Sequence, residues 1–138
     1  MEVSSSIAQN RQLTNWYKNI KNGNIKLPRF QRMEAWDTHR IISFLETLIH
    51  NLPVGVTLIL EVGETEKFKS RYISTAEEFA SEKVTEHLLD GQQRLTSFWR
   101  ALHNNYESET YFVYFPQFDD YYEDPHTDDI SIICRSRY

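Results

Sequence analysis

The stretch LLDGQQRLTSFWRAL, residues 88–102, joins an apolar run to an amphipathic helix through an Asp-Gly turn. The preceding run, VTEHLL at 84–89, has the composition of a core strand. The helix that follows is expected to turn one face inward, and that face carries Leu95, Phe98, Trp99 and Leu102. Along the whole chain the predicted order is helix, strand, helix, strand, strand, helix, strand, which is typical of folds that pack helices against a sheet. The chain is therefore predicted to be a small α+β (mixed α/β) domain.

The other segments alternate between helical and extended patterns. Helices are predicted over 4–20, 37–50 and 92–104, and Asp37 is the expected N-cap of the second helix. Strands are predicted over 25–28, 54–62, 84–89 and 109–116, while 71–74 and 129–135 also fit strands and 75–83 fits a short helix. At 138 residues the chain is expected to form a single domain, 1–138, with a short mixed sheet flanked by helices.

Charge is unevenly distributed along the chain. Residues 1–100 hold 13 Lys and Arg against 12 Asp and Glu, whereas residues 101–138 hold two Arg against eight acids. Six of these acids lie between Asp119 and Asp129, and we expect an exposed acidic loop over 117–129. A broad basic face for duplex DNA is not expected, so an anion would have to bind in a local pocket.

Cysteine usage and hydropathy exclude several classes of protein. The single cysteine, Cys134, cannot form a disulfide within the chain, and no group of cysteines and histidines has zinc-site spacing. The first residues lack the apolar core of a signal peptide, and no apolar run approaches the roughly 20 residues that a membrane span needs. We therefore expect a cytoplasmic protein without a membrane segment. Because the chain stops directly after a predicted strand, we expect it to be one domain of a longer protein.

The segment DGQQR, 90–94, lies where a strand meets a helix start. Backbone N–H groups of a first helical turn lack partners and favour an anion. Gly91 allows backbone to approach a ligand closely, the glutamine amides offer hydrogen bonds, and Arg94 offers a charged fork suited to phosphate. Asp90 could cap the helix, hold Arg94 or coordinate a metal. The alternative interpretation is an ordinary N-cap turn with exposed polar residues.

A second polar cluster lies in LPRFQRMEAW, 27–36, where Arg29, Gln31 and Arg32 share one short loop. These three side chains could clamp a phosphate or a base, and Trp36 is the best aromatic candidate for ligand contact. The alternative is that Phe30 and Trp36 are core residues and that the arginines pair with acids nearby in the loop, which are Glu34 and Asp37.

The order LPRFQRMEAWD, LPVGVTLILEV and HLLDGQQRLTSFWRAL resembles the N-terminal domain of GmrSD-type restriction endonucleases. The motif positions are Pro28, Phe30, Gln31, Arg32, Trp36, Pro53, Gly55 and the stretch Asp90 to Leu95. The resemblance covers about residues 7–115. It implies a fold similar to ParB and sulfiredoxin, in which a polar loop and a helix start together hold a nucleotide.

The resemblance also implies a function. Members of the family look like NTP-hydrolysing modules that govern the cleavage of foreign, often modified, phage DNA, with an NTP and Mg²⁺ as cofactors. DNA would be reached through the full-length protein or a nuclease partner, because this chain has no HNH nuclease half. The expected catalytic residues are Asp90, Gln93 and Arg94. The expected phosphate-binding residues are Arg29, Gln31, Arg32, Gly91, Gln92 and Arg94.

Two other functions remain open at this stage. A module of the same fold without catalysis could bind DNA phosphate or a modified base in the same pocket. An interaction domain could have lost its ligand, although the intact polar set disfavours this. The five histidines are scattered, and His87, on the strand before DGQQR, is the strongest candidate among them for a site role.

Overall fold

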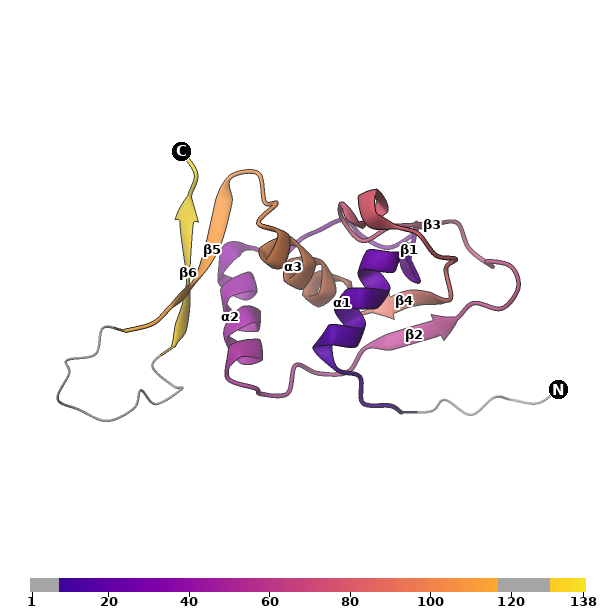
Figure 1. Ribbon diagram of the computed structural model, residues 1–138, viewed down its shortest axis with the longest axis horizontal. Coiled ribbons are helices and arrows are strands. Elements are labelled where there is room, and N and C mark those ends of the chain that lie inside the picture. Colours follow the sequence, from indigo (N-terminus) through magenta and orange to yellow (C-terminus); the bar gives the residue numbers. More distant parts are fainter. Residues whose placement is uncertain (1–7, 117–129) are drawn as a thin grey trace.

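A computed structural model describes residues 8–116 and 130–138. The helices are α1 (Leu13–Asn22), α2 (Thr38–Ile49) and α3 (Gln92–His103), together with a short 3₁₀ turn η1 (Ala76–Phe79). The strands are β1 (Ile25–Pro28), β2 (Leu58–Glu61), β3 (Ser70–Arg71), β4 (Glu86–Asp90), β5 (Glu109–Tyr114) and β6 (Ser131–Ser136). Figure 1 shows the small sheet at one end of the molecule, the β5–β6 hairpin at the other, and α2 and α3 between them. The α+β class predicted from the sequence is confirmed.

The principal sheet is mixed and has the order β2-β4-β1-β3. Strand β4 runs parallel to β1, with Ile25 opposite Glu86, and antiparallel to β2. Strand β1 pairs with the start of β4, whereas β2 pairs with β4 as far as Asp90, which lies opposite Leu58. This end of β4, Asp90, leads through Gly91 into α3.

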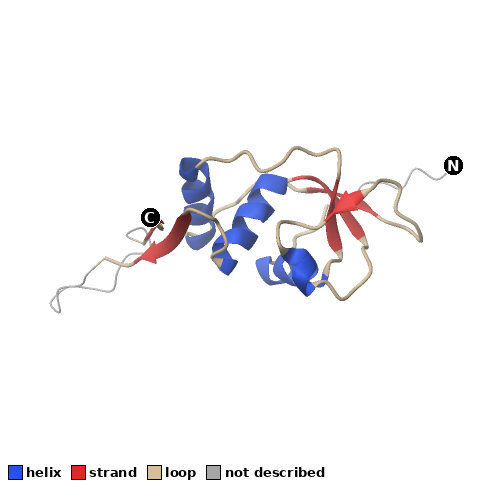
Figure 2. Ribbon diagram, turned by 90° about the horizontal axis from the view of Figure 1, so that it is seen from above, coloured by secondary structure: helices blue, strands red, loops and turns tan. Residues whose placement is uncertain are grey.

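Helix α3 connects two hydrophobic clusters. Leu95 and Trp99 pack into the first cluster, between the sheet and α1, with Ile20, Ile25, Leu27, Ile73, Ala76 and Leu88. Phe98 faces the second cluster, with Ile41, Phe44, Leu45 and Ile132 from α2 and β6. Figure 2 shows the helices beside one another next to the strands of the sheet. Trp99 is fully buried, so its packing fixes α3 relative to the sheet. Leu102 was expected in the core, but it is 59% exposed and belongs to neither cluster.

Local signals explain several boundaries. Gly23 ends α1 in the left-handed conformation, as the KNGN segment predicts. The Asp37 carboxylate accepts a hydrogen bond from the Arg40 backbone N–H, which confirms it as the N-cap of α2. Helix α1 begins only at Leu13, so the expected helical start is wrong for residues 8–12; residues 1–7 lie outside the described part of the chain.

The strand expected over 54–62 is observed only as β2, Leu58–Glu61. Residues 54–57 leave the sheet, and Gly55 has a φ of +97°. In this segment, the carbonyl oxygens of Val54 and Val56 accept hydrogen bonds from the Arg94 side chain of α3 and not from a neighbouring strand. The acidic loop expected over 117–129 lies outside the described residues. None of the helices in the described ranges combines the length and apolar character needed to cross a membrane.

Candidate functional site

A pocket of about 460 Å³ opens where β4 ends and α3 begins. Its lining residues come from the two polar segments singled out in the sequence: Gln31, Arg32, Trp36, Leu89, Asp90, Gly91, Gln92, Gln93 and Arg94. The loop that contains PRFQR therefore lies against the DGQQR helix start, although some 58 positions separate them along the chain. Arg29 is exposed and does not line this pocket.

The first turn of α3 carries no side-chain cap. Gly91 occupies the N-cap position with a φ of +98°, and the carboxylate of Asp90 does not accept from the turn. The Gly91 carbonyl accepts the Leu95 N–H, which starts the helix. The N–H groups before Leu95 have no acceptor within the helix, so they give this edge of the pocket a partial positive charge. A Cβ on Gly91 would stand 3.2 Å from the Thr57 side chain, which leaves glycine as the residue that fits.

Arg94 turns away from the helix start and binds the 54–57 segment. Its guanidinium donates to the carbonyl oxygens of Val54 at 2.8 Å and Val56 at 2.7 Å. The Asp90 carboxylate lies 3.8 Å away, with a side chain that is 73% exposed. Both terminal nitrogens of the guanidinium thus donate to backbone oxygens, and Arg94 forms a wall of the pocket.

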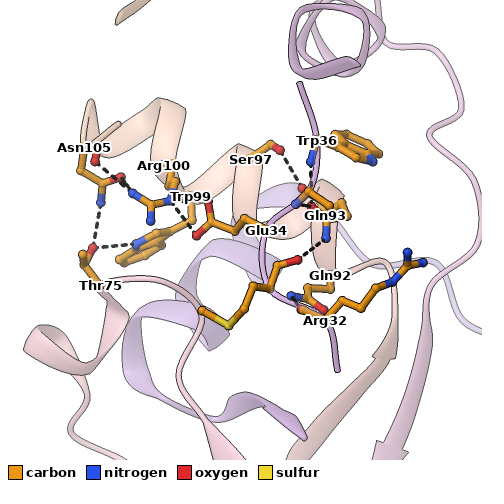
Figure 3. A network of polar contacts seen from close by, with 12 residues as sticks. Arg32, Glu34, Trp36, Thr75, Gln92, Gln93, Ser97, Trp99, Arg100 and Asn105 are labelled. Carbon is orange, nitrogen blue, oxygen red and sulfur yellow. Dashed lines mark hydrogen bonds and ion pairs between the residues drawn. The ribbon is translucent and has the colours of Figure 1, made fainter. Parts of the chain in front are cut away.

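Gln93 holds the backbone of the loop 33–36. Its Oε1 accepts from the N–H groups of Ala35 at 2.9 Å and Trp36 at 3.3 Å, and its Nε2 donates to the Met33 carbonyl at 3.2 Å (Figure 3). Both ends of this amide are therefore engaged. The ion pair between Glu34 and Arg100, at 2.7 Å, fastens the same loop to α3 about two turns further along the helix.

Two further glutamines join the loop to the strand and helix. The Nε2 of Gln31 donates to the carbonyl oxygens of Leu88 at 2.6 Å and Leu89 at 2.9 Å, at the end of β4. The Nε2 of Gln92 donates to the carbonyl of Arg32. Arg71 on β3 donates to that same carbonyl at 3.1 Å. The backbone at Arg32 is thus held from two directions.

Arg32 presents the unpaired cation of the pocket. Its side chain is exposed, lines the cavity and has no hydrogen-bond or ion-pair partner among the described residues. The alternative pairing with Glu34 or Asp37 is wrong, because Glu34 binds Arg100 and Asp37 caps α2. Held by its backbone but free at its guanidinium, Arg32 is placed to bind an anion.

Trp36 combines both roles that the sequence left open. Its ring contacts Phe44 edge to face, with centroids 5.7 Å apart, and packs against the cluster between α2 and α3. It also lines the pocket, so part of its surface is available to a ligand. Phe30, by contrast, is 68% exposed and is not a core residue.

His87 has a structural environment outside the pocket lining. It is fully buried on β4, and its Nε2 lies 2.9 Å from a Glu66 carboxylate oxygen. The same oxygen accepts from the Ser70 hydroxyl. These contacts fasten the loop before β3 to the sheet, and the sequence provided no signal for this pairing between distant residues.

The sequence also missed the part played by Val54, Gly55 and Val56. In the sequence, only the Pro-x-Gly spacing in LPVGV marked this segment. The structure shows that the carbonyl oxygens of Val54 and Val56 accept hydrogen bonds from Arg94. Within residues 8–116 and 130–138, no group of three or more His, Cys, Asp or Glu forms a metal cluster. Among the residues that the structure describes, Asp90 is the one acid that lines the pocket.

Comparisons with known proteins identify the family of this chain. A family model described as the N-terminal domain of the GmrSD restriction endonuclease matches residues 13–135. An uncharacterised protein of Methanocaldococcus jannaschii is 34% identical over 99 residues, which cover 68% of this chain and 17% of that protein. The chain therefore spans about a sixth of the length of this curated relative. No solved structure matches this chain significantly.

Proposed function

Because the chain belongs to the family of GmrSD restriction endonuclease N-terminal domains, we propose that it binds and hydrolyses an NTP as the regulatory domain of an anti-phage restriction system. The observation that supports this most strongly is the pocket between the two polar segments. There an unpaired Arg32 faces a helix start without a side-chain cap. An arginine fork opposite free backbone N–H groups is a suitable environment for phosphate oxygens.

Each side chain has a role in this proposal. Arg32 and the N–H groups of the first turn of α3 bind phosphate and neutralise charge that develops during hydrolysis. Gln93 and Arg94, which were expected to be catalytic, position the walls of the site through their bonds to backbone. Arg29 lies outside the pocket lining and would contribute only through its charge at longer range.

Asp90 is the residue in the pocket that fits a metal ion. Its carboxylate is 73% exposed and lies beside the cavity. Mg²⁺ commonly binds one or two carboxylates together with substrate phosphates, so a single acid suits a metal that arrives with the nucleotide. When bound, the metal would neutralise phosphate charge. The Asp90 carboxylate would also orient the attacking water.

The role in restriction concerns a longer protein or a complex. In the proposal, NTP turnover in this domain controls the cleavage of modified foreign DNA by a nuclease domain or partner chain in the cytoplasm. The near balance of charge in residues 1–100 disfavours strong duplex binding by this chain itself, because such binding draws on many basic contacts, and the proposal therefore assigns DNA contact to the larger assembly.

A non-catalytic module that binds DNA phosphate or a modified base is the second candidate. It is favoured by one observation: both terminal nitrogens of Arg94, the arginine of DGQQR, donate to the backbone carbonyl oxygens of Val54 and Val56. With fewer free cations, the site would hold a phosphate group without stabilising its transfer.

Calorimetric titration tests the main proposal. The chain would be titrated with Mg²⁺ and each of the four NTPs, as wild type, Arg32→Ala and Arg40→Ala, and hydrolysis would be measured for wild type and Asp90→Asn. We expect Arg32→Ala to abolish binding, Arg40→Ala on the exposed face of α2 to retain it, and Asp90→Asn to lose turnover. Binding of NTP without any turnover, or binding only of a DNA fragment, would favour the second candidate. A folded protein that binds neither would contradict both.

A further inference from the structure

The amide groups of Gln31 and Gln92 have a defined orientation in the pocket. The Nε2 of Gln31 contacts two carbonyl oxygens, and the Nε2 of Gln92 contacts the Arg32 carbonyl. A carbonyl oxygen accepts hydrogen bonds only, so the nitrogen end of each amide must face it. The oxygen end of each amide therefore points the other way.

Neither amide oxygen has a partner among the described residues. No hydrogen bond is formed by Oε1 of Gln31 or Gln92, and neither atom is among the fully buried polar atoms that lack a partner. Gln92 as a whole is only 7% exposed, and both residues line the pocket. Gln92 thus keeps an unpaired acceptor in a nearly buried position that is reachable from the cavity.

The free atoms of these two glutamines are chemically unsuited to phosphate. A phosphate oxygen accepts hydrogen bonds and carries negative charge, so it gains nothing from another acceptor. A ligand group at this place must instead donate, through an N–H or an O–H. The pocket consequently has a donor part, formed by Arg32 and the α3 start, and an acceptor part, formed by the two amide oxygens.

We propose that the acceptor part binds the nucleoside of the ligand, through N–H donors of the base or hydroxyl groups of the ribose. This inference rests on the proposed NTP-binding function and assigns Gln31 and Gln92 to recognition of the nucleoside, where the sequence had suggested phosphate. Trp36 lines the same cavity and offers an aromatic surface to a base. Gln93 is excluded from this role because both ends of its amide bind backbone.

Inorganic tripolyphosphate separates the two parts, because it carries the phosphates but no donor. Binding of an NTP and of tripolyphosphate would be measured for wild type, Gln92→Met, Gln31→Met and Gln93→Met. For wild type we expect the NTP to bind at least about tenfold more tightly than tripolyphosphate. Gln92→Met should reduce NTP affinity roughly tenfold more than tripolyphosphate affinity, because tripolyphosphate is affected only through the lost bond to the Arg32 carbonyl, which Arg71 still holds.

Gln93→Met is the matched control for loop anchoring. It also breaks bonds to the loop, but it removes no free pocket atom, so it should weaken both ligands in proportion. If Gln92→Met fails to fold, Gln31→Met provides the same test, since its acceptor is equally unpaired. Titration with a 2′-deoxy-NTP distinguishes the ribose from the base. If Gln92→Met no longer lowers the affinity for this ligand, the 2′-hydroxyl of the ribose is the group that binds Oε1 of Gln92.

Three results would overturn the inference. The first is an equal loss of NTP and tripolyphosphate affinity in Gln92→Met, which would make Gln92 a phosphate contact. The second is an unchanged NTP affinity in both glutamine variants. The third is an effect that vanishes on chelation of Mg²⁺ although wild type still binds the NTP without the metal, which would assign the acceptors to metal-bound water. If wild type binds neither ligand, the proposed function itself fails, and this outcome is distinct from the other three.

Discussion

Arg94 and Gly55 lie so close that a Cβ on the glycine would stand 2.8 Å from Nη1 of the guanidinium. The same guanidinium binds the carbonyl oxygens on both sides of Gly55, those of Val54 and Val56. Gly55 also has a φ of +97°, a conformation that side chains disfavour. Arg94 can therefore reach these carbonyl oxygens because residue 55 is a glycine, and their contact forms one wall of the pocket.

Gly55→Ala should destabilise the domain by about 1–3 kcal/mol. The new methyl group would clash with the Arg94 guanidinium, and alanine disfavours the positive φ at this position. The free energy of unfolding in urea would measure this. Gly63→Ala is the matched control, since a Cβ there meets nothing within 4 Å, and it should change stability little. Equal effects of the two substitutions would show that the Arg94 contact does not constrain Gly55.

Arg94→Ala should lower the free energy of unfolding by roughly 1–3 kcal/mol, because two charged hydrogen bonds are lost and two carbonyl oxygens lose their donors. From the sequence alone, Arg94 reads as a surface residue whose removal would cost less than about 1 kcal/mol. Arg94→Lys should recover only part of the loss, because a single ammonium does not reproduce the planar fork. A variant that keeps full stability but loses NTP binding would show that Arg94 contacts the ligand directly.

Gln93→Leu should release the loop 33–36, since it removes three hydrogen bonds to backbone without a large change in volume. Amide hydrogen exchange would detect the change as lost protection at Ala35 and Trp36. Arg32 lies next to this segment, so NTP affinity should fall in parallel. Amides within α2 serve as the internal control, and unchanged exchange at Ala35 would argue against the anchoring role.

Glu66 should give the domain a pH-dependent contribution to stability. Hydrogen bonds from Ser70 and then from His87 lower the pKa of the Glu66 carboxyl below its ordinary value of 4.5. A lowered carboxyl pKa stabilises the native state above the unfolded pKa, and this stabilisation is lost as the pH falls through the native pKa. Wild type should therefore be more stable than Glu66→Gln at about pH 7, with a difference that shrinks below about pH 4.5.

Urea unfolding of both proteins across this pH range provides the measurement. Glu77→Gln, at an exposed position on η1, is a control that should match wild type at every pH. A difference between wild type and Glu66→Gln that does not vary with pH would show that the charge of Glu66 is not what stabilises the loop.

Local patterns in the sequence determined a large part of this fold. The α+β class, the caps at Asp37 and Gly23, and the strand-to-helix junction at Gly91 follow from residues that are near neighbours in the chain. Their physical basis is short in range: side-chain capping, glycine at a positive φ, and apolar periodicity. The two polar segments of the site were recognised for the same reason, since each is a short cluster of unusual residues.

Only the tertiary structure decided what the polar side chains do. The sequence shows that Gln93 and Arg94 are donors, but not that carbonyl oxygens at Met33, Val54 and Val56 receive them. It likewise could not show the shortened β2 or the exposure of Leu102, because both depend on how distant elements of the chain pack together. A polar group forms its hydrogen bond with a suitable partner that lies close to it in space. Which residue supplies that partner is decided only when the chain has folded.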